Sequence, residues 1–232
     1  NSTVIYDGTV AQTISHHLTY GNLQFAGTNN KTASGALDIN GTIAYSGILG
    51  GTTPTFVDAG YTHTVAGNFY LGAAYMQQAK LTGAIQLDGS NQDITNTNFN
   101  HLIIANSGGT VTLGGAAATP NINIYGNLTI NNNAIFDANI NNIYIYGNWN
   151  NATTGLFTQT DGTVTFVSTT ANQTIASNAN SYFGNLTITK NNGAINQTVT
   201  FTTTANVSRN LVLTADRAVV DFSNQTLKIG RY

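Results

Sequence analysis

The chain has 232 residues, enough to bury a large core, and only 7% of them are charged, with a formal net charge of −2. No basic run occurs, which argues against a nucleic-acid-binding protein, and no apolar stretch approaches the ~20 residues of a membrane helix. The chain has no cysteine, which excludes a disulfide framework and a thiolate metal site.

The residue types indicate strands and tight turns rather than helices. Asn, Thr and Gly make up about two-fifths of the chain, and no Glu occurs. Threonine favours extended backbone, while Asn and Gly adopt the left-handed conformations that corners require. With 41% hydrophobic residues, the chain is too apolar for a disordered protein. No signal peptide opens it, and it starts at Asn1 without Met, so we expect a mature segment of a longer protein.

One pattern is repeated three times along the chain, at a step of about eighty residues. Each copy begins with an apolar strand residue, continues to a Gln-x-Ile triplet, and reaches a polar residue followed by Leu. These positions are Val4, Gln12-Thr13-Ile14 and Asn22-Leu23; Ile85, Gln92-Asp93-Ile94 and His101-Leu102; and Val164, Gln173-Thr174-Ile175 and Asn185-Leu186. A long repeat of short strands predicts a repeat architecture.

The later part of each copy carries an Asp beside apolar residues and closes on a glycine two residues before an aromatic. These positions are Phe56-Val57-Asp58 and Gly67-Asn68-Phe69; Ile135-Phe136-Asp137 and Gly147-Asn148-Trp149; and Val219-Val220-Asp221 and Gly230-Arg231-Tyr232. We predict a single continuous segment over 1–232, made of three degenerate copies at approximately 1–70, 71–150 and 151–232.

Alternating apolar residues predict strands of about three to five residues, each with one buried face. One segment, Ala73–Leu81, departs from this pattern and predicts either a short helix or a bulged loop. After it, the predicted strands in chain order are Val111–Leu113, Ile122–Ile124, Leu128–Ile130, Ile143–Ile145, Val164–Phe166, Leu186–Ile188, Val199–Phe201, Leu211–Leu213, Val220–Phe222 and Leu227–Ile229.

Strands this short fit two all-β architectures. One is a parallel β-helix, or β-solenoid, of about ten short coils, with about four coils in each copy; the other is a row of tandem immunoglobulin-like β-sandwiches. No linker separates the copies, and Asn-rich corners between short strands favour the solenoid. In it, Asn side chains at successive corners are predicted to form hydrogen-bonded ladders along the rod.

Asp58, Asp137 and Asp221 recur at one position of the repeat and are the first candidates for a site. A row of calcium sites on one face is one interpretation. However, calcium takes six to eight oxygen ligands, and carboxylates several coils apart cannot share one ion. We therefore predict that these three residues cap turns beside the core.

Catalytic and metal-binding motifs are not evident in the sequence. Among His16, His17, His63 and His101 only the first two are adjacent, and neighbours on a strand point to opposite faces, so we expect no zinc site. No Gly-x-Ser-x-Gly motif occurs, and no close pair of carboxylates suggests a glycosidase. We expect a protein that is not an enzyme and that binds no metal and no cofactor.

Two surface patterns point to binding functions. Tyr144, Tyr146 and Trp149 alternate along one predicted strand face, and exposed aromatic rings can stack on sugars, although core packing is the favoured explanation for the aromatics that close the copies. The alternating threonines of Thr198–Thr204 are of the kind that an ice-binding surface needs, but the spacing between such runs is irregular.

The third copy carries a specific resemblance. It reads Gly162-Thr163-Val164-Thr165-Phe166, then Asn172-Gln173-Thr174-Ile175, then Phe183-Gly184-Asn185-Leu186-Thr187-Ile188-Thr189-Lys190. Together with Gly126-Asn127-Leu128-Thr129-Ile130 and Gly147-Asn148-Trp149, it resembles the β-strand repeats of very large Bacteroidota surface proteins, which include gliding-motility adhesins exported by the type IX secretion system. The chain departs from that pattern at His101, where Asn is usual, at Asp93, where Thr is usual, and at Gly230-Arg231-Tyr232.

The resemblance extends over essentially the whole chain and supplies no catalytic residues. It implies a structural or adhesive repeat segment of a large protein that is secreted to the bacterial cell surface, acting as a stalk or filament in cell adhesion or gliding motility. The expected partners are neighbouring repeats of the same long chain and an extracellular polysaccharide or solid surface, with no nucleic acid and no membrane insertion by this segment. The alternatives are a carbohydrate-binding or polysaccharide-degrading β-helix and an ice-binding protein.

Overall fold

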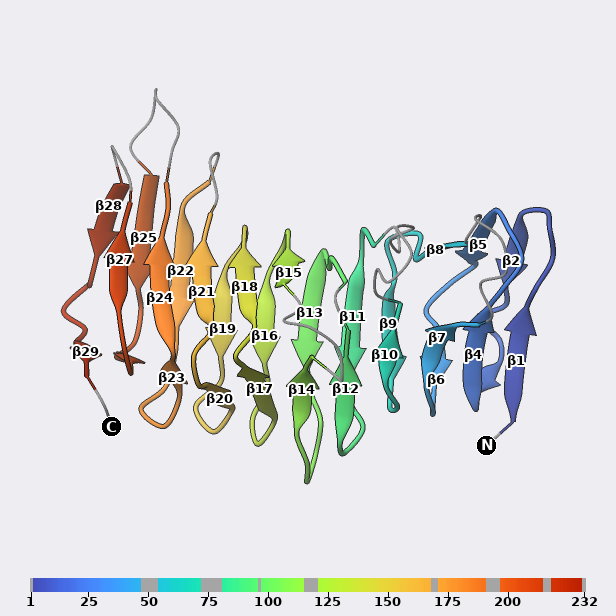
Figure 1. The fold of residues 1–232 in the computed structure, drawn as a ribbon, viewed down its shortest axis with the longest axis horizontal. Coiled ribbons are helices and arrows are strands. Elements are labelled where there is room, and N and C mark those ends of the chain that lie inside the picture. Colours follow the sequence, from blue (N-terminus) through green and yellow to red (C-terminus); the bar gives the residue numbers. More distant parts are fainter. Residues whose placement is uncertain are drawn as a thin grey trace.

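The computed structural model of this chain is a rod of short strands and describes residues 2–46, 54–71, 81–95, 97–114, 121–167, 171–190, 197–214 and 218–230. Within these residues every regular element is a strand, and the strands pair in parallel. The fold is therefore the predicted β-solenoid, because the sheets of an immunoglobulin-like sandwich are antiparallel. The strands follow one another along the rod, from the N-terminus at one end to the C-terminus at the other (Figure 1).

The chain winds around three faces, which we call face 1, face 2 and face 3 in the order that the first turn visits them. Face 1 begins as an eight-stranded sheet and continues as a three-stranded sheet, and the amide of Phe157 in the first donates to Ser181 Oγ, beside the second, at 2.9 Å. The strands of face 1 are β1 (Thr3–Tyr6), β4 (Asn22–Phe25), β7 (Ile43–Tyr45), β10 (Phe69–Tyr70), β12 (Gln92–Ile94), β14 (Val111–Leu113), β17 (Ile135–Asn139), β20 (Leu156–Gln159), β23 (Tyr182–Phe183), β26 (Ala205–Val207) and β29 (Leu227–Ile229).

Face 2 is divided in two, whereas face 3 runs through all three copies of the repeat as one ten-stranded sheet. Face 2 contains β2 (Gln12–Ile14), β5 (Asn30–Ala33) and β8 (Thr55–Val57), and then β15 (Asn121–Ile124), β18 (Asn142–Ile145), β21 (Thr163–Phe166), β24 (Asn185–Ile188) and β27 (Leu211–Leu213). Face 3 contains β3 (Thr19–Tyr20), β6 (Asp38–Ile39), β9 (Thr62–Val65), β11 (Ala84–Leu87), β13 (His101–Ile104), β16 (Leu128–Ile130), β19 (Trp149–Asn151), β22 (Gln173–Ala176), β25 (Gln197–Phe201) and β28 (Ala218–Asp221).

The predicted strands of the second and third copies are confirmed, with a shift at β28, which ends at Asp221 instead of Phe222. They form where apolar and polar residues alternate, because every second side chain then points into the rod. The segment for which a helix or a bulged loop was predicted lies outside the described residues, apart from Leu81.

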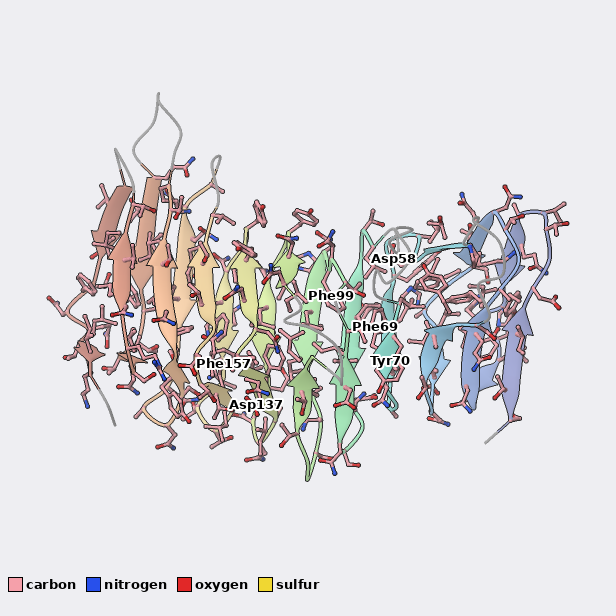
Figure 2. All side chains as sticks on the ribbon, in the orientation of Figure 1. Asp58, Phe69, Tyr70, Phe99, Asp137 and Phe157 are labelled. Atoms are coloured by element: carbon pink, nitrogen blue, oxygen red, sulfur yellow. The ribbon has the colours of Figure 1, made fainter. Side chains whose placement is uncertain are left out.

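The core is a set of apolar columns that run along the inside of the rod. On face 3, Trp149 lies in register between Leu128 and Ile175, and all three side chains are fully buried. Aromatic rings of neighbouring turns and faces also meet inside, such as those of Phe69 and Phe99, whose centroids are 5.4 Å apart (Figure 2). Each such side chain stabilises the fold by about 1.5–3 kcal/mol through burial.

The repeat of about eighty residues does not correspond to a whole number of turns. Val4 lies on face 1 in the first turn, whereas its equivalent Ile85 lies on face 3 in the fourth turn, which is three turns plus two faces later. The next equivalent, Val164, lies on face 2 in the eighth turn, after the same advance. Each copy therefore spans three and two-thirds turns of the solenoid, where about four were expected. As a result, consecutive copies present equivalent residues on different faces.

Candidate functional site

The aromatic site predicted from the sequence is not a single surface. Trp149 is fully buried, and its ring meets that of Phe157 edge-on at a centroid distance of 4.7 Å, so it cannot contact a surface ligand. The prediction that it shares a strand face with Tyr144 and Tyr146 is wrong because the chain turns at Gly147. Tyr144 lies on β18 of face 2, whereas Trp149 lies on β19 of face 3 and points inward.

Tyr144 and Tyr146 do lie on the outside, and a third tyrosine joins them. The ring of Tyr125 lies 5.1 Å from that of Tyr146 in the next turn, and Tyr125 is 53% exposed. Sequence reasoning missed Tyr125, although the triplet Tyr-Gly-Asn occurs at both positions, directly before the paired strands β16 and β19. Tyr125, Tyr144 and Tyr146, which we call the tyrosine patch, are the aromatic surface of face 2.

The threonine run does not continue into the neighbouring turns as an ice-binding array would require. Thr200 on β25 has Thr174 as its partner in the preceding turn, but Asp221 in the following turn. The neighbour of Thr174 in the turn before is an asparagine, because the Thr174 amide donates to Asn148 Oδ1 at 2.8 Å. This outward column therefore mixes Asn, Thr and Asp, and the regular spacing of one side chain type is absent from it.

Asp58, Asp137 and Asp221 cap turns, as predicted from the sequence. In each copy the carboxylate Oδ1 accepts the amide two residues ahead, at 3.1, 2.8 and 2.8 Å respectively. The turn that follows contains a non-glycine residue with positive φ in each case, such as Asn139 at 52°. The three carboxylates lie on three different faces, at the ends of β8, β17 and β28, so they form no calcium row (Figure 2 shows Asp58 and Asp137 at opposite edges of the rod).

Asp58 is the most deeply embedded of these carboxylates and has no exposed surface. Besides its turn, it accepts the amides of Thr82 at 2.9 Å and Gly83 at 2.7 Å, as well as the Thr82 hydroxyl at 2.9 Å. Its lone pairs are thus occupied by the next turn of the solenoid, which makes it a structural residue and not a general base.

His63 is a second buried polar group beside Asp58. Its Nδ1 accepts the amide of Leu37 at 3.0 Å, so Nε2 carries the hydrogen and donates to the carbonyl of Asp58 at 3.1 Å. Burial lowers the pKa of His63, with the carbonyl and charge of Asp58 acting in the opposite direction. The ring is therefore held neutral between two backbone groups, in a position that stabilises the corner.

Two of the three recurring glutamines, Gln92 and Gln173, are buried corner amides. Gln92 Nε2 donates to the carbonyls of Val65 and Gly67 at 2.7 and 2.6 Å, and its Oε1 accepts the amide of Gly89 at 2.8 Å. In the third copy, Gln173 Nε2 donates to the carbonyls of Ile145 and Gly147 in the same arrangement. Both glutamines satisfy backbone groups of the preceding turn that would otherwise be buried without partners.

The Gly-Asn pairs build the corners between turns. Asn127 Oδ1 accepts the amide of Asn148 in the next turn at 2.9 Å, which confirms the predicted asparagine ladder. At Gly147, a Cβ atom would lie 2.2 Å from the carbonyl oxygen of Gly126. Only glycine therefore lets the two turns approach this closely. His101, the departure from the usual Asn, serves the same purpose, because its Nδ1 accepts the amide of Asn127 at 2.9 Å.

Two lysines are buried, and in the part of the chain that the structure describes neither has a carboxylate partner. Lys31 Nζ donates to the carbonyls of Gly8 and Thr28 at 2.7 and 2.8 Å. Lys190 Nζ donates to Gln173 Oε1 and to a backbone carbonyl, and burial lowers its pKa to about 8. Both amines close corners from inside the rod.

Among the residues that the structure describes, no group of three or more His, Asp or Glu side chains could hold a metal ion, and no helix could cross a membrane. The reason given above for separating His16 and His17 is wrong, since both lie in the turn between β2 and β3 with ring centroids 3.8 Å apart. Comparison with protein-family models, with curated proteins and with solved structures finds no match for this chain.

Proposed function

We propose that this chain is a non-catalytic structural and adhesive segment of a large secreted bacterial surface protein, which acts as a stalk or filament in cell adhesion or gliding motility. One observation carries the proposal: the positions that recur in all three copies are used to build turns and corners. The recurring Gln and Asp side chains bind backbone groups, as Gln92, Gln173, Asp58, Asp137 and Asp221 do. A chain that repeats only its scaffold is suited to length and stiffness.

The arrangement of hydrogen bonds supports a mechanical role. The strands of each face pair with those of the turns before and after, so the backbone bonds point along the rod. Side-chain bonds between turns reinforce them at the corners, such as the one from the Asn148 amide to Asn127 Oδ1. Tension between the two ends is then carried by many bonds in each turn, and a turn opens only when all of them break.

The two ends of the rod support neighbouring repeats of the same long chain as partners. Val4, in register with the buried Leu23, is 37% exposed, and at the other end Leu213 and Ile229 are 55% and 53% exposed. These residues occupy core columns, and a further turn of the same kind would cover them and pair with the free strand edges.

The advance of three and two-thirds turns per copy also suits a spacer. Equivalent residues lie on a different face in each of the three copies, so no face is built from one repeated surface. Location outside the cell, at the bacterial surface, follows from the sequence resemblance and agrees with the absence of cysteine and the low charge of the chain.

Single-molecule pulling between the two termini tests this proposal. We expect discrete steps of about 70–90 Å, because one turn, such as Leu23 to Ile43, extends by roughly 3.5 Å per residue when it is released. Smooth extension at low force, without steps of this length, would overturn the mechanical role. A full-length protein in which no further copies flank this segment would overturn the stalk.

A further inference from the structure

We propose that the tyrosine patch of Tyr125, Tyr144 and Tyr146 on face 2 is a binding surface for a neutral polysaccharide. The inference deepens the adhesive part of the proposed function by naming a site and a class of ligand. It does not depend on the mechanical part, because the patch lies on the outside of turns whose packing is already complete.

The patch is exposed and held rigidly. Tyr125 is 53% and Tyr146 37% exposed, and their rings lie 5.1 Å apart with a tilt of 41°. The amide of Tyr146 donates to the carbonyl of Ile124 at 2.9 Å, and that of Tyr125 donates to the carbonyl of Phe99 at 2.9 Å, so both backbones are fixed by the turn before. A ligand therefore meets tyrosines whose backbone is already ordered before binding.

The scaffold does not require tyrosine at these positions. The residues before the glycines of other corners are Asn40 before Gly41 and Ala66 before Gly67, and those corners close equally well. Two large aromatic side chains exposed side by side gain little from burial. Their presence is explained by a ligand better than by packing.

The phenol hydroxyls of the patch are available for a ligand. Within the described residues, none of the three makes a hydrogen bond to the protein, in contrast to Tyr20, whose hydroxyl donates to the carbonyl of Ser15 at 2.7 Å, and Tyr70, whose hydroxyl donates to Asp93 at 3.3 Å. Each free hydroxyl can donate one hydrogen bond and accept others, which matches the hydroxyl groups of a sugar.

The surroundings of the patch favour a neutral ligand. The outward residues of β15 and β18 beside the tyrosines are Asn121, Asn123 and Asn142, and Thr163 follows on β21. None of them carries a charge, so an acidic polymer would find no cation there. A sugar ring presents C–H groups with a small positive charge to the negative face of an aromatic ring, and its hydroxyls match the amides and phenols.

A peptide fits this face less well. β18 and β21 have a paired strand on either side, and the end strand β15 is bonded to Phe99 of the preceding turn through the Asn123 carbonyl and the Tyr125 amide, so the backbone beside the tyrosines is already used and a peptide cannot add to it as a strand. No charged side chain on these strands would orient a peptide either. A rigid polymer of sugar rings needs neither feature.

The test is affinity electrophoresis of the whole chain in gels that contain hydroxyethylcellulose, xyloglucan or dextran, with alginate as the acidic polymer, and co-sedimentation with cellulose and chitin. We expect at least one neutral polysaccharide to retard the protein. The double variant Tyr125→Ala/Tyr146→Ala is expected to lose at least tenfold in affinity, and Tyr125→Phe/Tyr146→Phe is expected to lose less, because it keeps the rings.

Tyr182→Ala is the matched control, since Tyr182 lies on face 1 and is 37% exposed, the same fraction as Tyr146. Its binding should equal that of the unaltered chain, and circular dichroism should show that all variants are folded. The proposal is overturned if no neutral polysaccharide binds, if only alginate binds and salt abolishes this binding, or if the alanine variants at the two sites behave alike. The length of the pulling steps should stay unchanged in the double variant. A negative result for polysaccharide binding would therefore not contradict the proposed mechanical role.

Discussion

The inner turns and the end turns of the rod place the same kinds of residue in the same register, yet they bury them to different degrees. In the middle, Trp149 and Phe157 are fully enclosed, whereas Leu213 and Ile229 in the last turns are more than half exposed. Val199 and Val220 show the change within one column, since the first is fully buried and the second only partly so.

The comparison shows that a turn does not bury its own core residues: the turns on either side of it do. The stability of one position is then set by how many neighbouring turns it has, as in other stacked repeats. Residues of the same type should therefore matter much more in the middle of the rod than at its ends. Four pairs of substitutions test this, in decreasing order of expected effect.

Trp149→Ala should give the largest effect. The indole is fully buried against Phe157 and Phe183, so its removal leaves a cavity and should lower the free energy of unfolding by about 3–5 kcal/mol. At the end of the rod, Leu213→Ala should cost less than about 1 kcal/mol, against about 2–5 kcal/mol for a fully buried Leu, because half of that side chain already lies in water. Urea denaturation of both variants measures the difference, and equal losses would contradict the dependence on neighbouring turns.

Asp58→Ala should be the second largest. The amides of Thr82 and Gly83 would lose their acceptor in a buried corner, at a cost of about 2–4 kcal/mol. Asp221 occupies the equivalent position in the third copy but lies exposed, and among the described residues its carboxylate accepts the amide and the hydroxyl of Ser223. Asp221→Ala should therefore cost less than about 1 kcal/mol. Denaturation midpoints that fall equally in the two variants would count against the comparison.

The architecture was readable from the sequence because strand period and turn residues report directly on local conformation. Alternation at Leu186–Ile188 and Leu227–Ile229, for example, predicts strands that the structure contains. The turn-capping carboxylates were equally readable, since an Asp that follows an apolar pair at the end of a strand commonly accepts the amide two residues ahead.

What the sequence did not reveal is how the turns are stacked. Trp149 was predicted on the strand face of Tyr144 and Tyr146 because one continuous strand was assumed, but a corner at Gly147 sends Tyr144 and Trp149 to different faces. Tyr125 was missed because its partner Tyr146 lies one full turn away, and turns of unequal length hide that register: Leu23 pairs with Ile43, and Ile43 with Phe69. Contacts of this kind are set by the geometry of the corner and not by local propensity.

Lys190 should make stability depend on pH. Its pKa is about 8 in the folded chain and near 10.5 when exposed, because burial disfavours the charged amine. Below pH 8 both states hold the proton and the cost of burying the charge is complete; above it, the folded chain releases the proton first. The free energy of unfolding should thus rise between pH 8 and 9.5, by about 1–2 kcal/mol.

Lys190→Met should flatten this rise, and Lys228→Met, which removes an exposed amine in the last turn, is the matched control at the end of the rod. Urea denaturation at several values of pH, kept below the range in which tyrosines titrate, gives both slopes. A slope that persists in Lys190→Met would show that the inner lysine is not the group responsible.

His101→Ala should have the smallest of the four effects and the most local one. The ring of His101 replaces the usual asparagine of the ladder, and its Nδ1 accepts the amide of Asn127 at 2.9 Å, much as Asn22 Oδ1 accepts the amide of Thr42 at 2.9 Å. Loss of that acceptor should cost about 1 kcal/mol and speed hydrogen exchange at the Asn127 amide.

The substitution His101→Asn separates the hydrogen bond from the ring. An asparagine carbonyl can accept the same amide, as Asn127 Oδ1 does for Asn148, so this variant should keep both the stability and the slow exchange. His17→Ala, in the exposed first turn, removes a ring without removing an acceptor for the backbone and should leave exchange at Asn127 unchanged. If His101→Asn loses as much protection as His101→Ala, the ring packing and not the ladder holds this corner, and the inner turns would owe their stability to the core columns alone.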